Sequence, residues 1–423
     1  MSLPPPWLPC CGRGGSSGPH SVGQSHFNCA KSIFYVINAC GRWDGVRRMA
    51  SANGRRTGLE KPLDPDPAVS DPNGAALVPP MMLKGVDTLR FVAAAWVAVA
   101  HGALAPFIDA ATRVGGPVAL LGKIVTGSVS GGAAVAMFFV LSGLCIHYPN
   151  VGKDRLDWRR FLVKRMVRIV PPLVAAMLLA NLLGPAYRAF FDLALWSIYC
   201  EIAYYLAYPI VFPFLDRRPI TALAMSFGLA IAIAAAKPTA LAPWEFGPLT
   251  WLVFAHLWLA GALVADRIRR RGIGAPPSVM ILMMWRGGAV LLSAFTTVAT
   301  FHLPVKIGAC WTFLPMAVFA LGWLPRELAS YMARPPLRAL ERAGLAGYSS
   351  YLMHTIALVG SKMLLAGSLS VWALPLPAIL IVAASFLFYI GIERPFHRLA
   401  QWLGKRVPAR TTWSLAVGHA AEA

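Results

Sequence analysis

The chain has 423 residues, of which 57% are hydrophobic and only 13% carry a charge, and its mean hydropathy is +0.58. Soluble domains carry about 25% charged residues, so this composition excludes a soluble enzyme and a disordered chain. The formal net charge of +21 comes from 39 Lys and Arg against 18 Asp and Glu. On so apolar a chain, this excess is typical of basic loops at an anionic cytoplasmic leaflet and not of a nucleic-acid binder. The sequence therefore predicts a multi-pass membrane protein with no nucleic-acid partner.

Residues 1–80 differ in composition from the rest of the chain. They are rich in Gly, Pro, Ser and Asp, and they hold no apolar run long enough for a membrane helix or a signal-peptide core. Such a composition predicts disorder. One interpretation is a regulatory extension; the other is sequence upstream of a true start at Met49, Met81 or Met82. The second is favoured, because residues of functional type begin only at Leu83.

Ten stretches are long and apolar enough to cross a bilayer, which requires roughly 20 residues per helix. They are 86–107, 132–149, 169–185, 193–215, 219–236, 249–266, 279–302, 305–324, 347–366 and 373–392. The fourth contains Glu201, which predicts an interrupted or re-entrant outer end. Because a bilayer offers no water to the backbone, an all-α bundle follows. The predicted domains are an N-terminal extension, a membrane domain and a short cytoplasmic tail, over residues 1–80, 81–399 and 400–423.

The Lys and Arg residues indicate an orientation for these helices. With a cytoplasmic N-terminus, the inside segments carry most of them, at 153–168, 217–218, 267–271, 326–342 and 394–410. The outside segments hold only Arg113, Lys123, Arg188, Lys237 and Lys306. By the positive-inside rule, both termini are cytoplasmic. A change of one helix would move basic loops outside, which favours ten helices over nine or eleven.

The seven cysteines follow neither a disulfide framework nor the spacing of zinc ligands. They are Cys10, Cys11, Cys29, Cys40, Cys145, Cys200 and Cys310. The sequence therefore predicts buried or incidental thiols and no metal site. It also contains no nucleophile elbow, P-loop, dinucleotide fingerprint or zinc-protease motif of the kind found in soluble enzymes.

Ionisable side chains inside a membrane are costly to bury and mark candidate functional sites. Arg90 and His101 are eleven residues apart in the first predicted helix. They therefore return to within about 20° of the same face and lie about 16 Å apart along the axis. This spacing puts a cation near the cytoplasmic entrance and an imidazole in the outer half. The structural alternative is that both side chains reach out to the two interfaces.

Two further positions extend this candidate site. Glu201 is expected in the outer half as well, where a carboxylate would hold the imidazole in one tautomer and make His101 a general base towards a hydroxyl. The alternative is a glutamate that serves packing alone. Arg165 and Arg168 lie on one helical face at the membrane edge. Paired guanidiniums there suit a phosphate-bearing ligand from the cytoplasm.

Six segments resemble, in order, motifs of the integral membrane acyltransferase-3 family, whose members O-acylate bacterial surface sugars and other acceptors. The resemblance runs from about Leu83 to Leu399. Its segments are 83–90 with His101, 138–143, 165–168 with Pro171, 196–201 with Tyr204 and Tyr205, 348–354 and 393–395.

The resemblance implies transfer of an acyl group, usually acetyl, from cytoplasmic acyl-CoA to a hydroxyl of a carbohydrate or glycolipid acceptor. The reaction would occur in the bacterial cytoplasmic (inner) membrane, among membrane lipid and without a permanently bound cofactor. His101 would be the essential base or a transient acyl carrier, and Glu201 would support it or the acceptor. Residues expected to bind substrate or donor are Arg90, Arg165, Arg168, Ser142, Trp196, Tyr351 and His354.

Two other functions compete with acyl transfer. The first is a transporter or flippase for a lipid-linked sugar or another amphiphile, which would move its substrate without covalent change. The second is a catalytically inactive sensor with the same fold. The sensor is disfavoured, because the histidine, the glutamate and the arginines of the motifs are all present.

Overall fold

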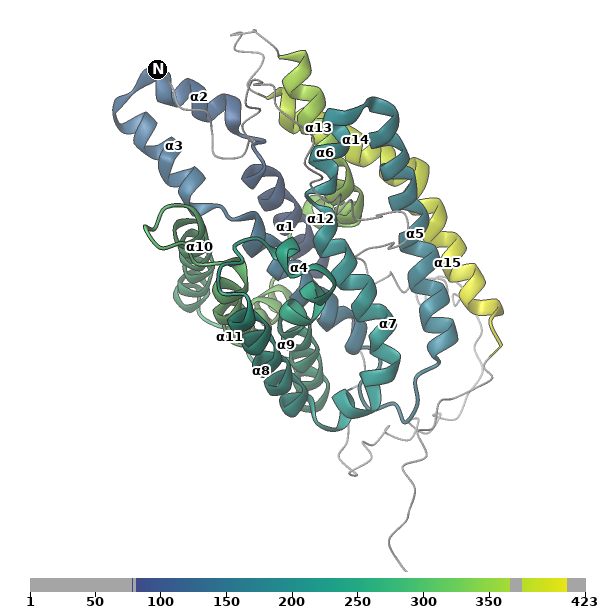
Figure 1. Ribbon diagram of the computed structural model, residues 1–423. Coiled ribbons are helices and arrows are strands. Elements are labelled where there is room, and N and C mark those ends of the chain that lie inside the picture. The colour runs from purple at the N-terminus through teal and green to yellow at the C-terminus, as the bar shows by residue number, and fades with distance from the viewer. Residues whose placement is uncertain (1–77, 79–80, 366–374, 409–423) are drawn as a thin grey trace, which may run out of the picture. The chain divides into compact units, whose positions relative to one another are not determined.

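The computed structural model describes residue 78, residues 81–365 and residues 375–408. Apart from residue 78, the predicted N-terminal extension lies outside this described part, as do residues 409–423 of the predicted tail. All regular secondary structure in the described part is helical (Figure 1), which confirms the predicted all-α class.

The α-helices follow one another with short connections. In chain order they are α1 (Val86–Ala100), α2 (Ala105–Val114), α3 (Gly116–Ser128), α4 (Gly131–His147), α5 (Trp158–Leu183), α6 (Pro185–Asp192), α7 (Leu195–Arg217), α8 (Pro219–Ala236), α9 (Thr250–Arg271), α10 (Val279–Phe301), α11 (Ala309–Ala333), α12 (Arg338–Gly344), α13 (Gly347–Leu364), α14 (Leu376–Phe388) and α15 (Arg394–Arg406). A 3₁₀-helix, η2 (Pro243–Leu249), precedes α9, and a π-helical segment, η4 (Tyr389–Glu393), joins α14 to α15.

The predicted apolar stretches overlap helices, although their ends differ in places and two expectations about breaks are wrong. The stretch 86–107 is broken, because α1 ends at Ala100 and Gly102 adopts a φ of 105° that side-chain-bearing residues rarely tolerate. The interruption expected at Glu201 is absent, and α7 runs unbroken through that residue. The carboxylate does not disrupt the helix, because it finds hydrogen-bond donors inside the bundle.

The described part of the chain contains six to eight candidate membrane spans. By length and composition, six helical runs can cross a membrane: α5, α7, α8, η2 with α9, α10, and α14 with α15. The other two are bent pairs, α1 with α2 at 53° and α3 with α4 at 41°. This count does not confirm the predicted ten.

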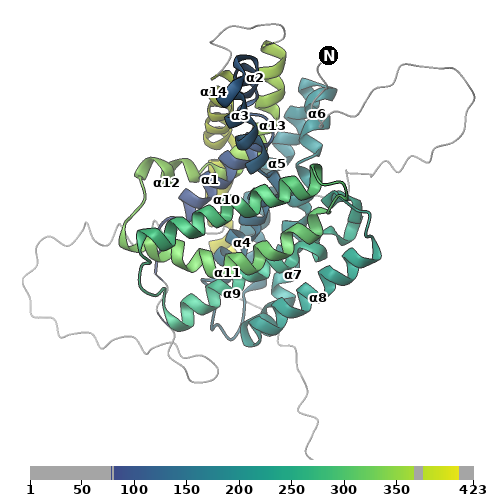
Figure 2. The ribbon, with the colours of Figure 1, turned by 90° about the vertical axis from the view of Figure 1, so that its left-hand side faces the viewer.

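Helix α4 lies at the centre of the helix contacts and packs against α1, α9, α10 and α11. Helices α8, α9, α11 and α10 lie side by side in that order (Figure 2). Helix α15 runs along α5, and α13 packs against α14 (Figure 1). The predicted burial of cysteines is confirmed for Cys145, Cys200 and Cys310, which are free thiols, while the other four lie outside the described residues.

Two glycines set the close crossing of α4 and α9. A Cβ atom added to Gly143 would lie 1.8 Å from the carbonyl oxygen of Trp258. One added to Gly261 would lie 1.8 Å from the carbonyl oxygen of Val140. Small residues at such crossings let the backbones of membrane helices approach closely.

We expect Gly143→Ala to destabilise the protein strongly, because the added methyl group meets backbone atoms that cannot rotate away. The loss of stability should reach at least the upper end of the range of about 1–3 kcal/mol for overpacked cores. Thermal unfolding in detergent measures it as a lowered Tm. Gly228→Ala in α8 is the control, because a Cβ there meets no atom within 4 Å. Equal Tm values for both variants would contradict the close crossing.

Candidate active site

His101 lies at the point where both bent helix pairs break. It caps the C-terminus of α1, and its Nδ1 donates to the carbonyl oxygen of Val97 at 2.8 Å. A carbonyl oxygen can only accept, so Nδ1 carries the proton and Nε2 of the neutral ring keeps its lone pair. Gly131, the first residue of α4, lies against this ring, since a Cβ there would be 3.4 Å from Cε1 of His101. The fold thus holds the imidazole in a tautomer suited to a general base.

A second histidine, His354 of α13, lies beside the first. The ring centroids of His101 and His354 are 5.1 Å apart, and Phe190 meets His101 edge-on at 6.0 Å. His354 is buried, and its Nδ1 donates to the carbonyl oxygen of Tyr351 at 2.6 Å. Its Nε2 has no hydrogen-bond partner among the described residues. Both rings therefore direct an acceptor nitrogen away from the backbone.

Tyr351 connects these histidines to α7. Its hydroxyl lies 2.5 Å from the hydroxyl of Ser197 and donates to the carbonyl oxygen of Ala194 at 3.0 Å. Phe138 of α4 packs edge-on against its ring at 5.9 Å. Helices α4, α7 and α13 thus meet at this tyrosine.

Glu201 lies one turn after Ser197 on α7 and is completely buried. Its Oε1 accepts hydrogen bonds from the hydroxyl of Ser142 and from that of Tyr205, the latter at 2.7 Å. The indole of Trp258 donates to Ser142 at 3.2 Å. Oε2 has no hydrogen-bond partner in the described part of the chain. One carboxylate thus joins α4 to α7, and Ser142 extends the network to α9.

The expected pairing of Glu201 with His101 is replaced by other contacts. The carbonyl of Val97 accepts from the imidazole, while Ser142 and Tyr205 donate to the carboxylate. The cause is local: the last turn of α1 leaves a carbonyl oxygen directly beside the ring that caps it.

The three arginines of the predicted site lie together at the opposite end of α1. Arg90 is buried, forms a 2.5 Å ion pair with Asp87 and donates to the sulfur of Cys145 at 3.3 Å. Arg168 is also buried and lies within electrostatic range of Arg90 and Arg165. The guanidinium of Arg165 lies 5.6 Å from the ring centroid of Phe161.

The carboxyl group of Glu201 also faces this cluster. Arg165 and Arg90 act on it electrostatically. The guanidinium of Arg165 lies 6.0 Å from the ring centroid of Tyr205, which donates to Glu201. The structure therefore brings Arg90, Arg165, Arg168, Ser142 and Glu201 into one region, with His101, Tyr351 and His354 in the neighbouring one.

Glu393 is a member of the arginine region to which the sequence analysis assigned no role. Its Oε2 accepts from the backbone N–H and the hydroxyl of Ser349, at 3.0 and 2.6 Å, and its charge acts on Arg168. It closes the π-helical segment η4, a geometry often found at functional sites. The available signals were its place in the motif segment 393–395 and at the end of an apolar stretch, but its partner Ser349 is 44 residues away.

Trp196 lies in an apolar layer next to these polar groups. Its ring centroid is 6.1 Å from that of Phe139 and 5.4 Å from that of Phe254. Trp196 therefore packs, through Phe139, against the part of α4 that carries Ser142.

Further cations gather around the loop between α4 and α5. The ammonium group of Lys153 donates to Oδ1 of Asn150 at 2.8 Å. Burial lowers the pKa of Lys153, and the positive charges of Arg269, Lys164 and Arg160 lower it further. These like charges disfavour one another's charged forms, and a nearby anion would favour them.

The chain was compared with known proteins. A protein-family profile described as an acyltransferase domain matches residues 83–393, which include every side chain named above. Acyltransferase MdmB of Streptomyces mycarofaciens is 26% identical over 383 residues, a match that covers 79% of this chain and 96% of that protein. No solved structure matches.

Proposed function

Because the chain belongs to the acyltransferase-3 family and is a membrane acyltransferase, we propose that it moves an acyl group from cytoplasmic acyl-CoA to an acceptor hydroxyl at the outer side. The acceptor is a sugar hydroxyl of a glycan or glycolipid, and acetyl-CoA is the first donor to test. The protein would sit in the bacterial inner membrane with ten spans and both termini cytoplasmic. The observation that carries this proposal is that the imidazole of His101 and the arginine cluster lie at opposite ends of α1.

The proposed reaction is a direct acyl transfer with His101 as the base. Nε2 of His101 takes the proton of the acceptor hydroxyl while the hydroxyl oxygen attacks the thioester carbonyl carbon. The carbon–sulfur bond then breaks, and the CoA thiolate takes the proton from the imidazolium. The products are an ester and the CoA thiol. Contact with Phe190 and His354 shields the ring from bulk water, which protects the thioester from hydrolysis.

His354 and Glu201 have separate parts in this proposal. The unpartnered Nε2 of His354 accepts a hydrogen bond from a second hydroxyl of the acceptor, a group that sugars supply. Glu201 acts as a positioning residue, because its carboxylate orients Ser142 and Tyr205 and faces the charges of Arg165 and Arg90.

The cations would bind the phosphates of the donor. Coenzyme A carries a pyrophosphate and a ribose phosphate, and guanidinium groups bind such groups with paired hydrogen bonds. Arg90, Arg165 and Arg168 form the inner part of this proposed path. Lys153 and its basic neighbours form the part nearer the loop between α4 and α5. A transporter or flippase is not favoured, because the chain belongs to an acyltransferase family.

Transfer by membranes that contain the protein tests the proposal. Radiolabelled acetyl-CoA is supplied on the cytoplasmic side, and the glycan and lipid fractions are counted for covalently bound label. We expect label in one fraction, which identifies the class of acceptor by its partition. No label from acetyl-CoA, succinyl-CoA or longer acyl-CoA in any fraction would overturn the proposed donor.

We expect Arg168→Gln to weaken donor use. Loss of a hydrogen bond to a charged group costs about 1.5–3 kcal/mol, so the KM for acyl-CoA should rise about ten- to a hundredfold. Steady-state rates at saturating acceptor measure this change. Arg188→Gln is the control, since Arg188 of α6 pairs with the exposed Asp192 at 2.7 Å, away from the cluster. An unchanged KM for acyl-CoA in a folded Arg168→Gln protein would contradict donor binding, and Arg168 would then serve only as a positive charge that orients the helices in the membrane.

A further inference from the structure

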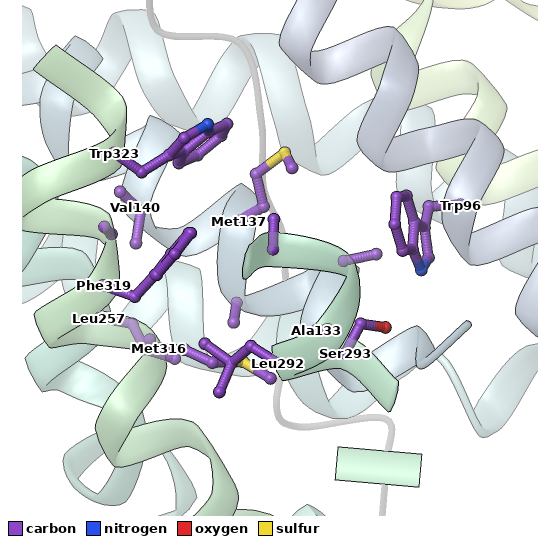
Figure 3. Close-up of a pocket in the computed structure, with 14 residues that line it drawn as sticks. Trp96, Ala133, Met137, Val140, Leu257, Leu292, Ser293, Met316, Phe319 and Trp323 are labelled. Atoms are coloured by element: carbon purple, nitrogen blue, oxygen red, sulfur yellow. The ribbon is translucent and has the colours of Figure 1, made fainter. Parts of the chain in front are cut away.

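An apolar cavity lies between α1, α4, α10 and α11, with one contribution from α9 (Figure 3). It is open on one side, and the space not filled by atoms in and in front of it is about 580 Å³, part of which is open solvent. Figure 3 shows Trp96 on one side, facing Phe319 and Trp323 across the cavity, with Met137 between them. None of the described residues that line it is charged.

Three lining side chains carry a polar group, and two of these groups are already bonded. The hydroxyl of Ser293 accepts from the backbone N–H of Ser130 at 2.9 Å. The indole of Trp323 donates to Glu327 at 3.2 Å. The indole nitrogen of Trp96 is buried and has no hydrogen-bond partner among the described residues. The cavity therefore offers one free donor in otherwise apolar surroundings, which suits a ligand with a hydrocarbon part and one carbonyl oxygen.

The cavity and His101 share the first turn of α4. Ser130, which bonds to the cavity residue Ser293, immediately precedes Gly131, and Gly131 lies against the ring of His101. Ala133 and Ala134, which follow in the same turn, line the cavity. A group that occupies the cavity thus lies within one helical turn of the residue that packs against His101.

We infer that this cavity receives the acyl chain of the thioester donor, with the N–H of Trp96 donating to the thioester carbonyl. The inference rests on the proposed function. Sugars and CoA phosphates do not fit, because their polar groups would lose water without finding partners. A lipid tail would fill the apolar space and leave the N–H of Trp96 unpaired. The cavity thus selects acyl groups longer than acetyl, such as butyryl, which cover more of its apolar wall.

Chain-length profiles test this inference, measured as kcat/KM for acetyl-, butyryl-, hexanoyl- and octanoyl-CoA. We expect the wild-type protein to prefer butyryl-CoA over acetyl-CoA. Ala289→Leu narrows the cavity and should lower the ratio of butyryl to acetyl transfer at least tenfold. Leu292→Ala widens it and should raise octanoyl transfer several-fold. Val290→Leu, on the neighbouring exposed position of α10, is the matched control and should leave the profile unchanged.

Trp96→Phe removes the donor N–H and keeps an aromatic ring in the cavity wall, so it tests the hydrogen bond apart from the shape of the cavity. It should lower kcat/KM about tenfold for every acyl-CoA and preserve the chain-length profile. Identical profiles in the wild type, Ala289→Leu and Leu292→Ala would overturn the inference and leave the proposed function intact. No transfer from any acyl-CoA by the wild type would overturn the proposed function, and the inference with it.

Discussion

Replacing His101 with alanine is expected to lower kcat for acyl transfer by about 10²–10⁴-fold, the usual contribution of a positioned general base. Without Nε2, the acceptor hydroxyl has no group to take its proton as it attacks the thioester. The fold should persist, because the backbone N–H at this position still bonds to Val97 at 3.0 Å. Initial rates of label transfer and thermal unfolding in detergent measure the two effects.

His302→Ala is the matched control for this prediction. His302 also caps the C-terminus of its helix, α10, through a backbone bond to Val298, but its side chain is exposed. It should retain wild-type transfer. Full activity of a stable His101→Ala protein would refute the assignment of the base. A burst of label that remains covalently bound to the wild-type protein would instead favour an acyl-histidine intermediate.

Glu201 is expected to give two different results with alanine and with glutamine. Glu201→Ala removes the acceptor for the hydroxyls of Ser142 and Tyr205, and each buried donor left unpaired costs about 1–3 kcal/mol. Both stability and transfer should fall. Glu201→Gln keeps an acceptor oxygen, so its Tm should stay close to that of the wild type. Its transfer rate should still fall about 10²-fold, because an amide facing Arg90 and Arg165 cannot ionise as the carboxyl group can.

Comparing the Tm and the transfer rate of the two Glu201 variants separates a role of the carboxyl group in the reaction from a role in packing. Glu245→Gln is the control, because this exposed glutamate accepts from the backbone N–H groups of Leu241 and Ala242 outside the site. Full transfer by Glu201→Gln would show that any buried acceptor suffices at this position. Equal loss of Tm in both Glu201 variants would show that the carboxylate acts on stability alone.

Properties that depend on one helix at a time were predictable from the sequence. The all-α class and most helix positions follow from runs of apolar residues, and α8 coincides with the predicted stretch 219–236. The separation of Arg90 and His101 along α1 follows from helical geometry alone. Helical geometry likewise predicts that Arg165 and Arg168 lie on one face of the same helix. The break at Gly102 was missed, since a single glycine within an apolar stretch does not mark a helix end by itself.

Contacts between helices were decided by the tertiary structure. Ser142 meets Glu201, Ser349 meets Glu393, and His101 lies beside His354. Each pair joins residues on different helices. A hydropathy pattern shows that a polar side chain is buried, but it does not show which residue of another helix that side chain contacts. The partner of His101 turned out to be the carbonyl of Val97, because the end of α1 supplies an acceptor closer than any carboxylate. By itself, the sequence determined that this is a helical membrane protein of the acyltransferase-3 type, with cations and an imidazole at opposite ends of one helix. Only packing decided which side chains share hydrogen bonds and where the cavity beside the imidazole forms, because both depend on contacts between distant segments.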